Sequence, residues 1–340
     1  MKFRHAVHDA TMMALDRDPS VFLIGVGVIV HPGANWNDEI GTPRKFKHRV
    51  IEGPLSEDGL TGISIGAATL GMKPILIHHR MDFALLTVNQ LFTHAAKWSA
   101  MFGHQQSVPM VVMVSVGRAL GNAAQHTQSM HAMFAHVPGL KTVVPSNPKD
   151  AKGLLLAALE DGGPVVYIQH RWLDQDEGAV PSGHYLTPIG KAEVVRSGSD
   201  ATIAAVGTGV ADALKAAEAL EKAGISVEVV DVRTIRPLDH ETVARSVMKT
   251  GRLVAVDSDW GPCGVAGEII AGAAERAFSH LKRPPVRVVW PETCLPFSQN
   301  LEHAFYPGAK EIQEATAALC DHACEKNSVQ NIVKHLEGPF

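Results

Sequence analysis

The sequence predicts two tandem α/β domains with mainly parallel sheets, and three observations support this fold class. The chain has 340 residues, which is too long for a comfortable single core and fits two domains of ordinary size. Short β-branched runs alternate with longer helical stretches in both halves, which is typical of parallel strands with helices on both faces of the sheet. A stretch rich in Gly, Pro and acidic residues, from about Gln175 to Lys191, separates the halves. We therefore expect one domain over residues 1–180, a linker over 181–197 and a second domain over 198–340.

The first half is predicted to alternate buried strands with helices. The apolar runs with the length of buried strands are Val21–Val28, Lys73–His78, Pro109–Val116, Lys141–Val144 and Pro164–Ile168. Helical periodicity is found over Asp58–Leu70, Phe83–Met101, Ser129–His136 and Pro148–Glu160. The helix after Glu57 is rich in Gly and Ala, and each Gly lowers helix propensity by up to about 1 kcal/mol. Close approach of another backbone or a ligand would offset this loss, and tight helix–sheet packing is an equally good explanation.

The second half repeats the alternation more regularly. Strands are predicted at Ala201–Val206, Ser226–Val230, Arg252–Val256 and Val286–Val289. Helices are predicted at Val210–Ala223, Asp239–Thr250, Val265–His280 and Gly308–Ala323. Each strand is followed by a helix, so this half also predicts a parallel sheet.

Composition excludes several classes of protein. The 31 basic and 35 acidic side chains give a net charge of −4, and no basic run suggests a nucleic-acid groove or an anionic membrane partner. The longest apolar stretch, Val21–Val30, is about half of what a bilayer requires, and the first residues lack a signal-type apolar core. The four Cys form no CxxC pair and are too few for a disulfide framework. We expect a soluble, cytoplasmic protein.

Common cofactor and hydrolase motifs are absent from the sequence. Neither Gly25-Val-Gly27 nor Gly207-Thr-Gly209 is followed by the third Gly of a dinucleotide-binding loop. No GxxxxGK[ST] loop or HExxH helix occurs. His126, His131 and His136 recur every five residues, which differs from the i, i+4 spacing of a helical metal pair, so we expect no three-His metal site.

The residues next to Glu57 indicate a structural role for it at the start of a helix. Ser56 and Asp58 are natural N-cap residues, and an acidic side chain in the first turn suits the helix dipole. The pattern along the rest of the chain favours a functional interpretation instead. Short pieces occur in one order: GPLSEDG at 53–59, MDF at 81–83, NQL at 89–91, AAK at 95–97, AQHTQS at 124–129, FAHVPGL at 134–140, VPS at 144–146, DAKGLL at 150–155, DVRTIRPLD at 231–239, GVAGEI at 264–269 and PFS at 296–298.

This ordered set resembles the beta subunit of the thiamine-diphosphate-dependent 2-oxo acid dehydrogenases, the decarboxylating component of pyruvate, branched-chain and acetoin dehydrogenase complexes. The resemblance covers about residues 3–318. It implies a transketolase-type pyrimidine-binding domain followed by a transketolase C-terminal-type domain. The function it implies is oxidative decarboxylation of a 2-oxo acid and acyl transfer to lipoate.

The resemblance also implies roles for three residues. Glu57 matches the glutamate that hydrogen-bonds the pyrimidine ring nitrogen and so assists removal of the thiamine C2 proton. Phe83 matches the aromatic residue that stacks on the pyrimidine, although a core Phe at a helix start would look the same in sequence. His126 matches the histidine at the active-site mouth, where it assists proton movements and acyl transfer.

Metal ions and partners follow from the same resemblance. Relatives often hold a structural potassium ion, and the matching positions are Met110, Ala158, Leu159, Asp161 and Gly163. No GDG sequence occurs in the chain, although thiamine enzymes bind the diphosphate and Mg²⁺ through a GDG…N motif. We therefore expect a separate alpha subunit to supply that half of the site in an α2β2 heterotetramer, which could in turn bind a lipoyl acyltransferase.

Two alternatives stay open at this point. His78-His79-Arg80 replaces the apolar or acidic residues that relatives carry before MDF, so the substrate could differ. One alternative is therefore a subunit of a thiamine-dependent carboligase or acyltransferase that uses an aldehyde or sugar acceptor. The other is a non-catalytic interaction subunit on the same fold, against which the retained Glu57, Phe83 and His126 argue.

Overall fold

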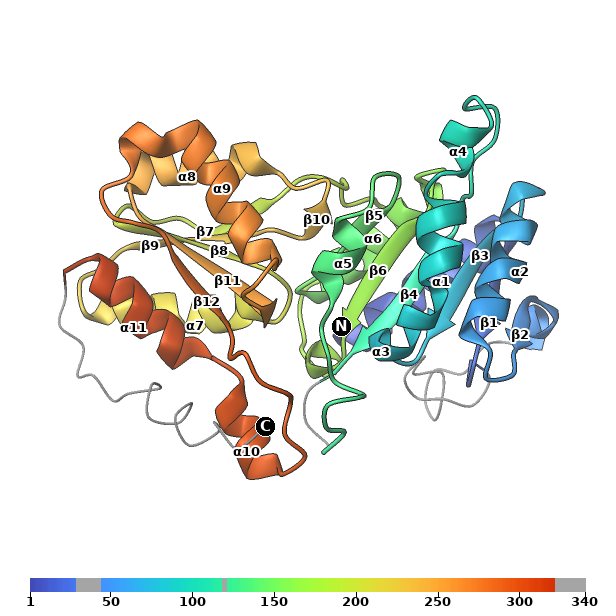
Figure 1. Ribbon diagram of the computed structural model, residues 1–340, viewed down its shortest axis with the longest axis horizontal. Helices are drawn as coiled ribbons and strands as arrows, with labels where there is room; N and C mark the ends of the chain where they lie inside the picture. Colours follow the sequence, from blue (N-terminus) through green and yellow to red (C-terminus); the bar gives the residue numbers. More distant parts are fainter. Residues whose placement is uncertain (29–43, 118–120, 322–340) are drawn as a thin grey trace. The chain divides into compact units, whose positions relative to one another are not determined.

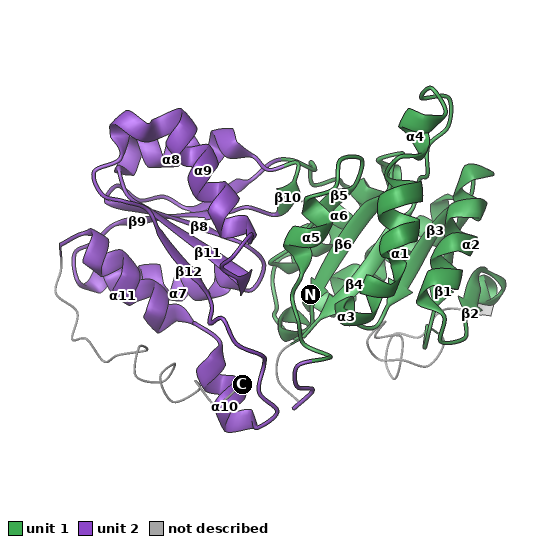
Figure 2. Cartoon of the chain, in the orientation of Figure 1, with its two compact units in different colours: residues 1–117, 125–190, 234–237 green, residues 118–124, 191–233, 238–340 purple. Residues whose placement is uncertain are grey.

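A computed structural model describes residues 1–28, 44–117 and 121–321 of the chain. The chain forms two compact units, which are coloured separately in Figure 2. The first unit contains residues 1–117, 125–190 and 234–237, and the second contains 118–124, 191–233 and 238–340. Within the described ranges, no helix is long and apolar enough to cross a membrane.

The first unit is built on a seven-stranded sheet of order β10-β5-β6-β4-β3-β1-β2. Its strands are β1 (Val21–Gly25), β2 (Val50–Glu52), β3 (Lys73–His78), β4 (Val111–Val116), β5 (Lys141–Val143), β6 (Val165–His170) and β10 (Thr234–Arg236). All neighbours pair in parallel except β10, which is antiparallel to β5. All five strands predicted in this half are present, because each is an apolar run that is buried in the sheet.

The helices of the first unit are α1 (Phe3–Arg17), α2 (Glu57–Thr69), α3 (Met81–Ala84), α4 (Trp98–Met101), α5 (His131–Ala135) and α6 (Pro148–Glu160). The 3₁₀ helices are η1 (Arg44–Arg49), η2 (Leu85–Thr87) and η4 (Arg171–Leu173), and η3 (Asn89–Ala95) is a π-helix. The prediction of one helix over Phe83–Met101 is wrong, because this segment is divided into α3, η2, η3 and α4. The Thr87 hydroxyl donates to the Ala84 carbonyl at 2.7 Å, which tightens the turn where α3 ends.

One face of this sheet is covered by α1 and α6. Both helices share a core with side chains at alternate strand positions, such as Leu23, Ile75 and Ile77. Helix α6 begins where predicted, since the Asn147 side chain accepts from the Asp150 N–H at 2.9 Å and Pro148 follows at the first helical position. Helix α2 packs against β3 and β1.

The second unit has a five-stranded sheet of order β12-β11-β8-β9-β7, in which only β7 is antiparallel. Its strands are β7 (Glu193–Arg196), β8 (Ala201–Ala205), β9 (Val227–Asp231), β11 (Leu253–Trp260) and β12 (Val286–Trp290). Its helices are α7 (Gly209–Lys222), α8 (His240–Thr250), α9 (Val265–Ala277), η5 (Phe278–His280), α10 (Gln299–Phe305) and α11 (Ala309–Leu319). The end of the predicted helix Gly308–Ala323 lies outside the described residues.

Helices cover both faces of the sheet in the second unit. Helices α7 and α11 pack on one face of the sheet and α8 and α9 on the other (Figure 1). Asp239 caps the start of α8 by accepting from the Thr242 N–H at 3.1 Å, and Gly251 ends it in the left-handed conformation at φ 77°. Both units are therefore α/β layers on mainly parallel sheets, which confirms the predicted fold class.

Candidate functional site

The carboxyl ends of β3, β4 and β6 lie next to one another, and we call this end of the first sheet its carboxyl edge. The register places His78 beside Val114 and Val116 beside His170, so the three strands end at neighbouring points. Ligands in parallel α/β sheets bind outside this edge, where the loops leave the strands. The chain after β3 carries the residues 81–83, and a second segment, residues 125–130, lies against it.

Phe83 and His126 are brought together at this edge. Their rings make an edge-to-face contact with centroids 5.1 Å apart and an interplanar angle of 86°. Both side chains are half-buried, so each ring keeps an accessible surface. The contact joins residues that lie more than forty positions apart, Phe83 in α3 and His126 in the segment before α5.

Asp82 of α3 holds these two segments together, and the sequence alone did not single it out. Its carboxylate is buried and accepts from the Gln128 side-chain amide at 2.8 Å and from the Gln128 N–H at 3.3 Å. The Met130 N–H also donates to the Met81 sulfur at 2.9 Å. Asp82 precedes Phe83, and Gln128 lies two residues after His126. The hydrogen bonds between Asp82 and Gln128 therefore fix the contact between the two rings. The only sign of the Asp82–Gln128 pair in the sequence is that the two residues belong to the MDF motif at 81–83 and the AQHTQ motif at 124–128.

Glu57 begins α2 and is half-buried. Its backbone carbonyl accepts from the Thr61 hydroxyl at 2.6 Å, and that hydroxyl lies 3.2 Å from Nε2 of His78, the last residue of β3. The first turns of α2 are therefore fastened to the same sheet edge. Phe83 and His126 contact each other directly. In the described structure Glu57 makes no hydrogen bond with either of them, and it is held at this edge only as the first residue of α2.

His78 is a buried histidine at this edge. Burial lowers the pKa of His78 to about 4, so its imidazole is neutral at neutral pH. A neutral ring can exchange a hydrogen bond with the Thr61 hydroxyl without bringing a charge into the sheet. His78 therefore acts as a fixed polar support under α2.

The five residues matched to a potassium site lie around the C-terminus of α6. Ala158 and Leu159 are in its last turn, Asp161 follows it, and Gly163 leads into β6. The Met110 carbonyl accepts from the Val165 N–H at 2.9 Å, which places Met110 beside the same segment. The last carbonyls of a helix lack intrahelical partners and are suitable ligands for a hard cation. The Asp161 carboxylate already forms an ion pair with the Lys141 ammonium.

The three histidines at 126, 131 and 136 do not form a metal site. His126 contacts Phe83, His131 is buried and lies 2.8 Å from the Ser129 hydroxyl, and His136 is exposed. Across the part of the chain that the structure describes, no group of three His, Cys, Asp or Glu side chains is placed to hold a metal ion.

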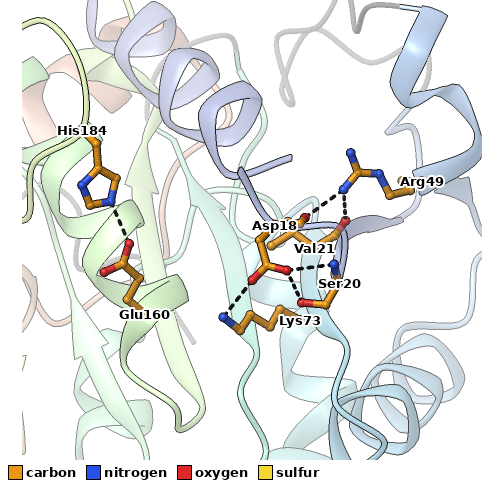
Figure 3. Close-up of polar contacts among 7 residues, drawn as sticks. All are labelled: Asp18, Ser20, Val21, Arg49, Lys73, Glu160 and His184. Carbon is orange, nitrogen blue, oxygen red and sulfur yellow. Dashed lines mark hydrogen bonds and ion pairs between the residues drawn. The ribbon is translucent and has the colours of Figure 1, made fainter. Parts of the chain in front are cut away.

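A cavity of about 270 Å³ lies at the opposite end of the first sheet, at the amino ends of β1 and β3. Figure 3 shows Asp18 accepting from the Ser20 N–H at 2.9 Å and from the Lys73 ammonium at 2.9 Å, while Glu160 and His184 pair at 2.7 Å. The Arg49 guanidinium donates to the Asp18 and Val21 carbonyls. Asp18 is therefore paired with Lys73 and Glu160 with His184, while Arg49 binds backbone carbonyls at the start of β1.

The hydrogen bonds of Asp18 lower the pKa of its carboxyl group. Burial by itself would raise the pKa of Asp18, but hydrogen bonds from Ser20 and Lys73 outweigh it and lower the pKa to about 2. Asp18 is thus ionised over the ordinary pH range and stabilises the turn between α1 and β1.

Comparisons with known proteins agree with this architecture. Residues 1–173 match the transketolase pyrimidine binding domain, and residues 190–312 match the transketolase C-terminal domain. The acetoin:2,6-dichlorophenolindophenol oxidoreductase subunit beta of Cupriavidus necator is 40% identical over 324 residues, covering 93% of this chain and 96% of that protein. The mitochondrial pyruvate dehydrogenase E1 component subunit beta of Homo sapiens is 38% identical over 91% of this chain and 88% of that protein.

The chain belongs to this family of transketolase-type dehydrogenase beta subunits. The resemblance found from the ordered motifs is therefore confirmed. A solved chain described as split gene transketolase, inactive beta4 tetramer, has a TM-score of 0.75 at 21% identity and covers 94% of this chain and 98% of that chain. At this identity the match supports the fold. The two curated relatives are each named as the beta subunit of an enzyme.

Proposed function

We propose that this chain is the beta subunit of a thiamine-diphosphate-dependent 2-oxo acid dehydrogenase and supplies the pyrimidine side of the active site. The observation that carries the proposal is the contact between Phe83 and His126 at the carboxyl edge of the sheet, fixed by Asp82 and Gln128. A half-buried aromatic ring beside a histidine fits a flat heterocycle at the point where α/β sheets bind ligands. When bound, thiamine diphosphate would supply the electron sink for decarboxylation.

Three residues of this chain would act toward that cofactor. Glu57 would hydrogen-bond the pyrimidine ring nitrogen and share its carboxyl proton with it, because α2 presents Glu57 at the edge that carries Phe83. The Phe83 ring would stack on the pyrimidine and orient it. His126 would move a proton to or from the acyl acceptor, since an imidazole is the usual side chain for proton transfer near neutral pH.

The surface of α2 supports assembly with other subunits. A Cβ added at Gly62 or Gly66 would meet nothing within 4 Å in the described structure, so the small residues are not explained by packing inside the chain. On the same stretch Ile63 is 59% exposed and Leu70 is 87% exposed. Apolar and small side chains left in solvent are typical of subunit interfaces. We propose an α2β2 heterotetramer in which the alpha subunit holds the diphosphate and Mg²⁺.

We also propose potassium at the C-terminus of α6. The carbonyls of Met110, Ala158, Leu159, Asp161 and Gly163 would supply oxygen ligands. A cation there would offset the negative end of the helix dipole. The Lys141 ammonium would share the Asp161 carboxylate with this ion.

The experiment that tests the proposed function is reconstitution. The chain is purified with its partner subunit, and decarboxylation of several 2-oxo acids is measured with thiamine diphosphate and Mg²⁺, with an artificial electron acceptor. Lipoyl and aldehyde acceptors are then compared, which separates the dehydrogenase from the carboligase. Turnover of a 2-oxo acid that requires both subunits supports the proposal. A purified complex that turns over no 2-oxo acid would contradict it and favour a non-catalytic subunit.

A further inference from the structure

Two arginines follow the carboxyl ends of the strands on either side of β4. Arg80 comes two residues after β3, and Arg171 comes directly after β6. Between them, β4 ends and is followed by Gly117. A Cβ added at Gly117 would lie 3.3 Å from Cδ of Arg171, so the Arg171 side chain lies against the end of β4. The absence of a side chain at Gly117 thus leaves room for Arg171 beside the strand.

The described residues offset the charges of the two guanidinium groups only in part. Among the described residues neither group forms an ion pair, and Nε of Arg80 is buried without a hydrogen-bond acceptor. Burial and, next, the charge of Arg171 lower the pKa of Arg80, whereas Asp82 raises it. The guanidinium group of arginine is effectively always charged in proteins. With Asp82 already accepting from Gln128, the cluster of Arg80, Arg171 and Asp82 keeps a net positive charge.

We propose that Arg80 and Arg171 form a subsite for an anionic group, a carboxylate or a phosphate, on the substrate or acyl acceptor. The subsite lies at the edge that carries Phe83, which is three residues after Arg80. An arginine fork matches carboxylate and phosphate oxygens, and an anion between two like charges would remove their repulsion. The class of ligand rests on the proposed function: a substrate that keeps an anionic group after decarboxylation, or an anionic acceptor.

Binding of simple anions to the full chain tests this subsite without turnover. Inorganic phosphate and succinate are titrated separately by calorimetry into the wild-type chain and into Arg80→Gln and Arg171→Gln. Arg245→Gln is the matched control, because Arg245 is exposed on α8 in the second unit. The same titrations are repeated on the chain reconstituted with its partner. Circular dichroism checks that each variant is folded, and Arg80→Lys retains the charge if Arg80→Gln is not.

We expect one of the two anions to bind saturably, with an affinity that falls about 10- to 100-fold in either Gln variant and stays unchanged in Arg245→Gln. Tighter phosphate binding would indicate a phosphorylated ligand, and tighter succinate binding a second carboxylate. Arg80→Lys should lose less than Arg80→Gln. No saturable binding in both preparations, or equal affinity in all variants, would overturn the subsite. A chain that binds the anion in this way but forms a complex without decarboxylation would overturn only the proposed function.

Discussion

Replacement of His126 separates a proton-transfer role from a packing role. His126→Ala removes both the imidazole and its edge contact with Phe83, whereas His126→Phe keeps an aromatic ring at the 5.1 Å contact and cannot carry a proton. The two variants can be told apart because packing and proton transfer contribute very different factors. An aromatic pair contributes about 0.5–1.5 kcal/mol, which is about 2- to 13-fold in cofactor affinity. General acid–base catalysis contributes about 10²–10⁴-fold to the step that it serves.

We therefore expect both variants to lose acyl transfer by about 10²–10⁴-fold. Only His126→Ala should also bind thiamine diphosphate about 2- to 13-fold more weakly. Transfer is measured in the reconstituted complex with the natural acceptor, and decarboxylation with an artificial electron acceptor that bypasses transfer. Decarboxylation should fall much less than transfer. Equal losses in the two assays, or normal transfer in His126→Phe, would refute the proton-transfer role and leave His126 as a packing residue.

Three further predictions follow from the site and its supports. The isolated chain should bind thiamine diphosphate very weakly by calorimetry with or without Mg²⁺, because it has no GDG motif to hold the diphosphate, and micromolar binding would be inconsistent with a half-site. Asp18→Asn should lower the free energy of unfolding at neutral pH by about 1 kcal/mol, since a third of the side chain is exposed and solvent screens its contacts. The folded pKa of about 2 lies below the ordinary 3.8, so this stabilisation is present above pH 3.8 and is lost as the pH falls toward 2; an unchanged acid-unfolding curve in Asp18→Asn would contradict it. Replacing potassium by sodium should lower the thermal midpoint of the chain, and identical melting curves in the two salts would argue against the ion.

Most strands were predictable from the sequence because they are buried runs of apolar residues. Strands β2, β7 and β10 were not predicted, because each is only three or four residues long and lies at the edge of its sheet. Helix α1 was also missed, because several residues on its buried side are small Ala side chains, which give a weak hydrophobic pattern. Its buried residues include Phe3, Ala6 and Ala10, which pack in the core shared with α6.

The candidate site was predictable only through the ordered motifs. Each of Glu57, Phe83 and His126 has an ordinary structural explanation when taken alone. The Asp82–Gln128 hydrogen bonds and the Arg80–Arg171 pair join segments far apart in the chain, so no local spacing could reveal them. The continuous helix predicted over Phe83–Met101 failed for a related reason, because tertiary contacts at the sheet edge override helical periodicity there.

If Glu57 activates thiamine diphosphate, exchange of the thiamine C2 proton depends on the Glu57 carboxylate. Exchange is followed by NMR in the reconstituted complex for the wild type, Glu57→Gln and Asp58→Asn. The last variant is the control, because Asp58 is an exposed acidic residue of the same first turn of α2. We predict normal exchange in Asp58→Asn and loss of fast exchange in Glu57→Gln with the fold intact, because an amide cannot hold and return a proton. Near-wild-type exchange in Glu57→Gln would show that Glu57 is only a helix-start residue and would contradict the account.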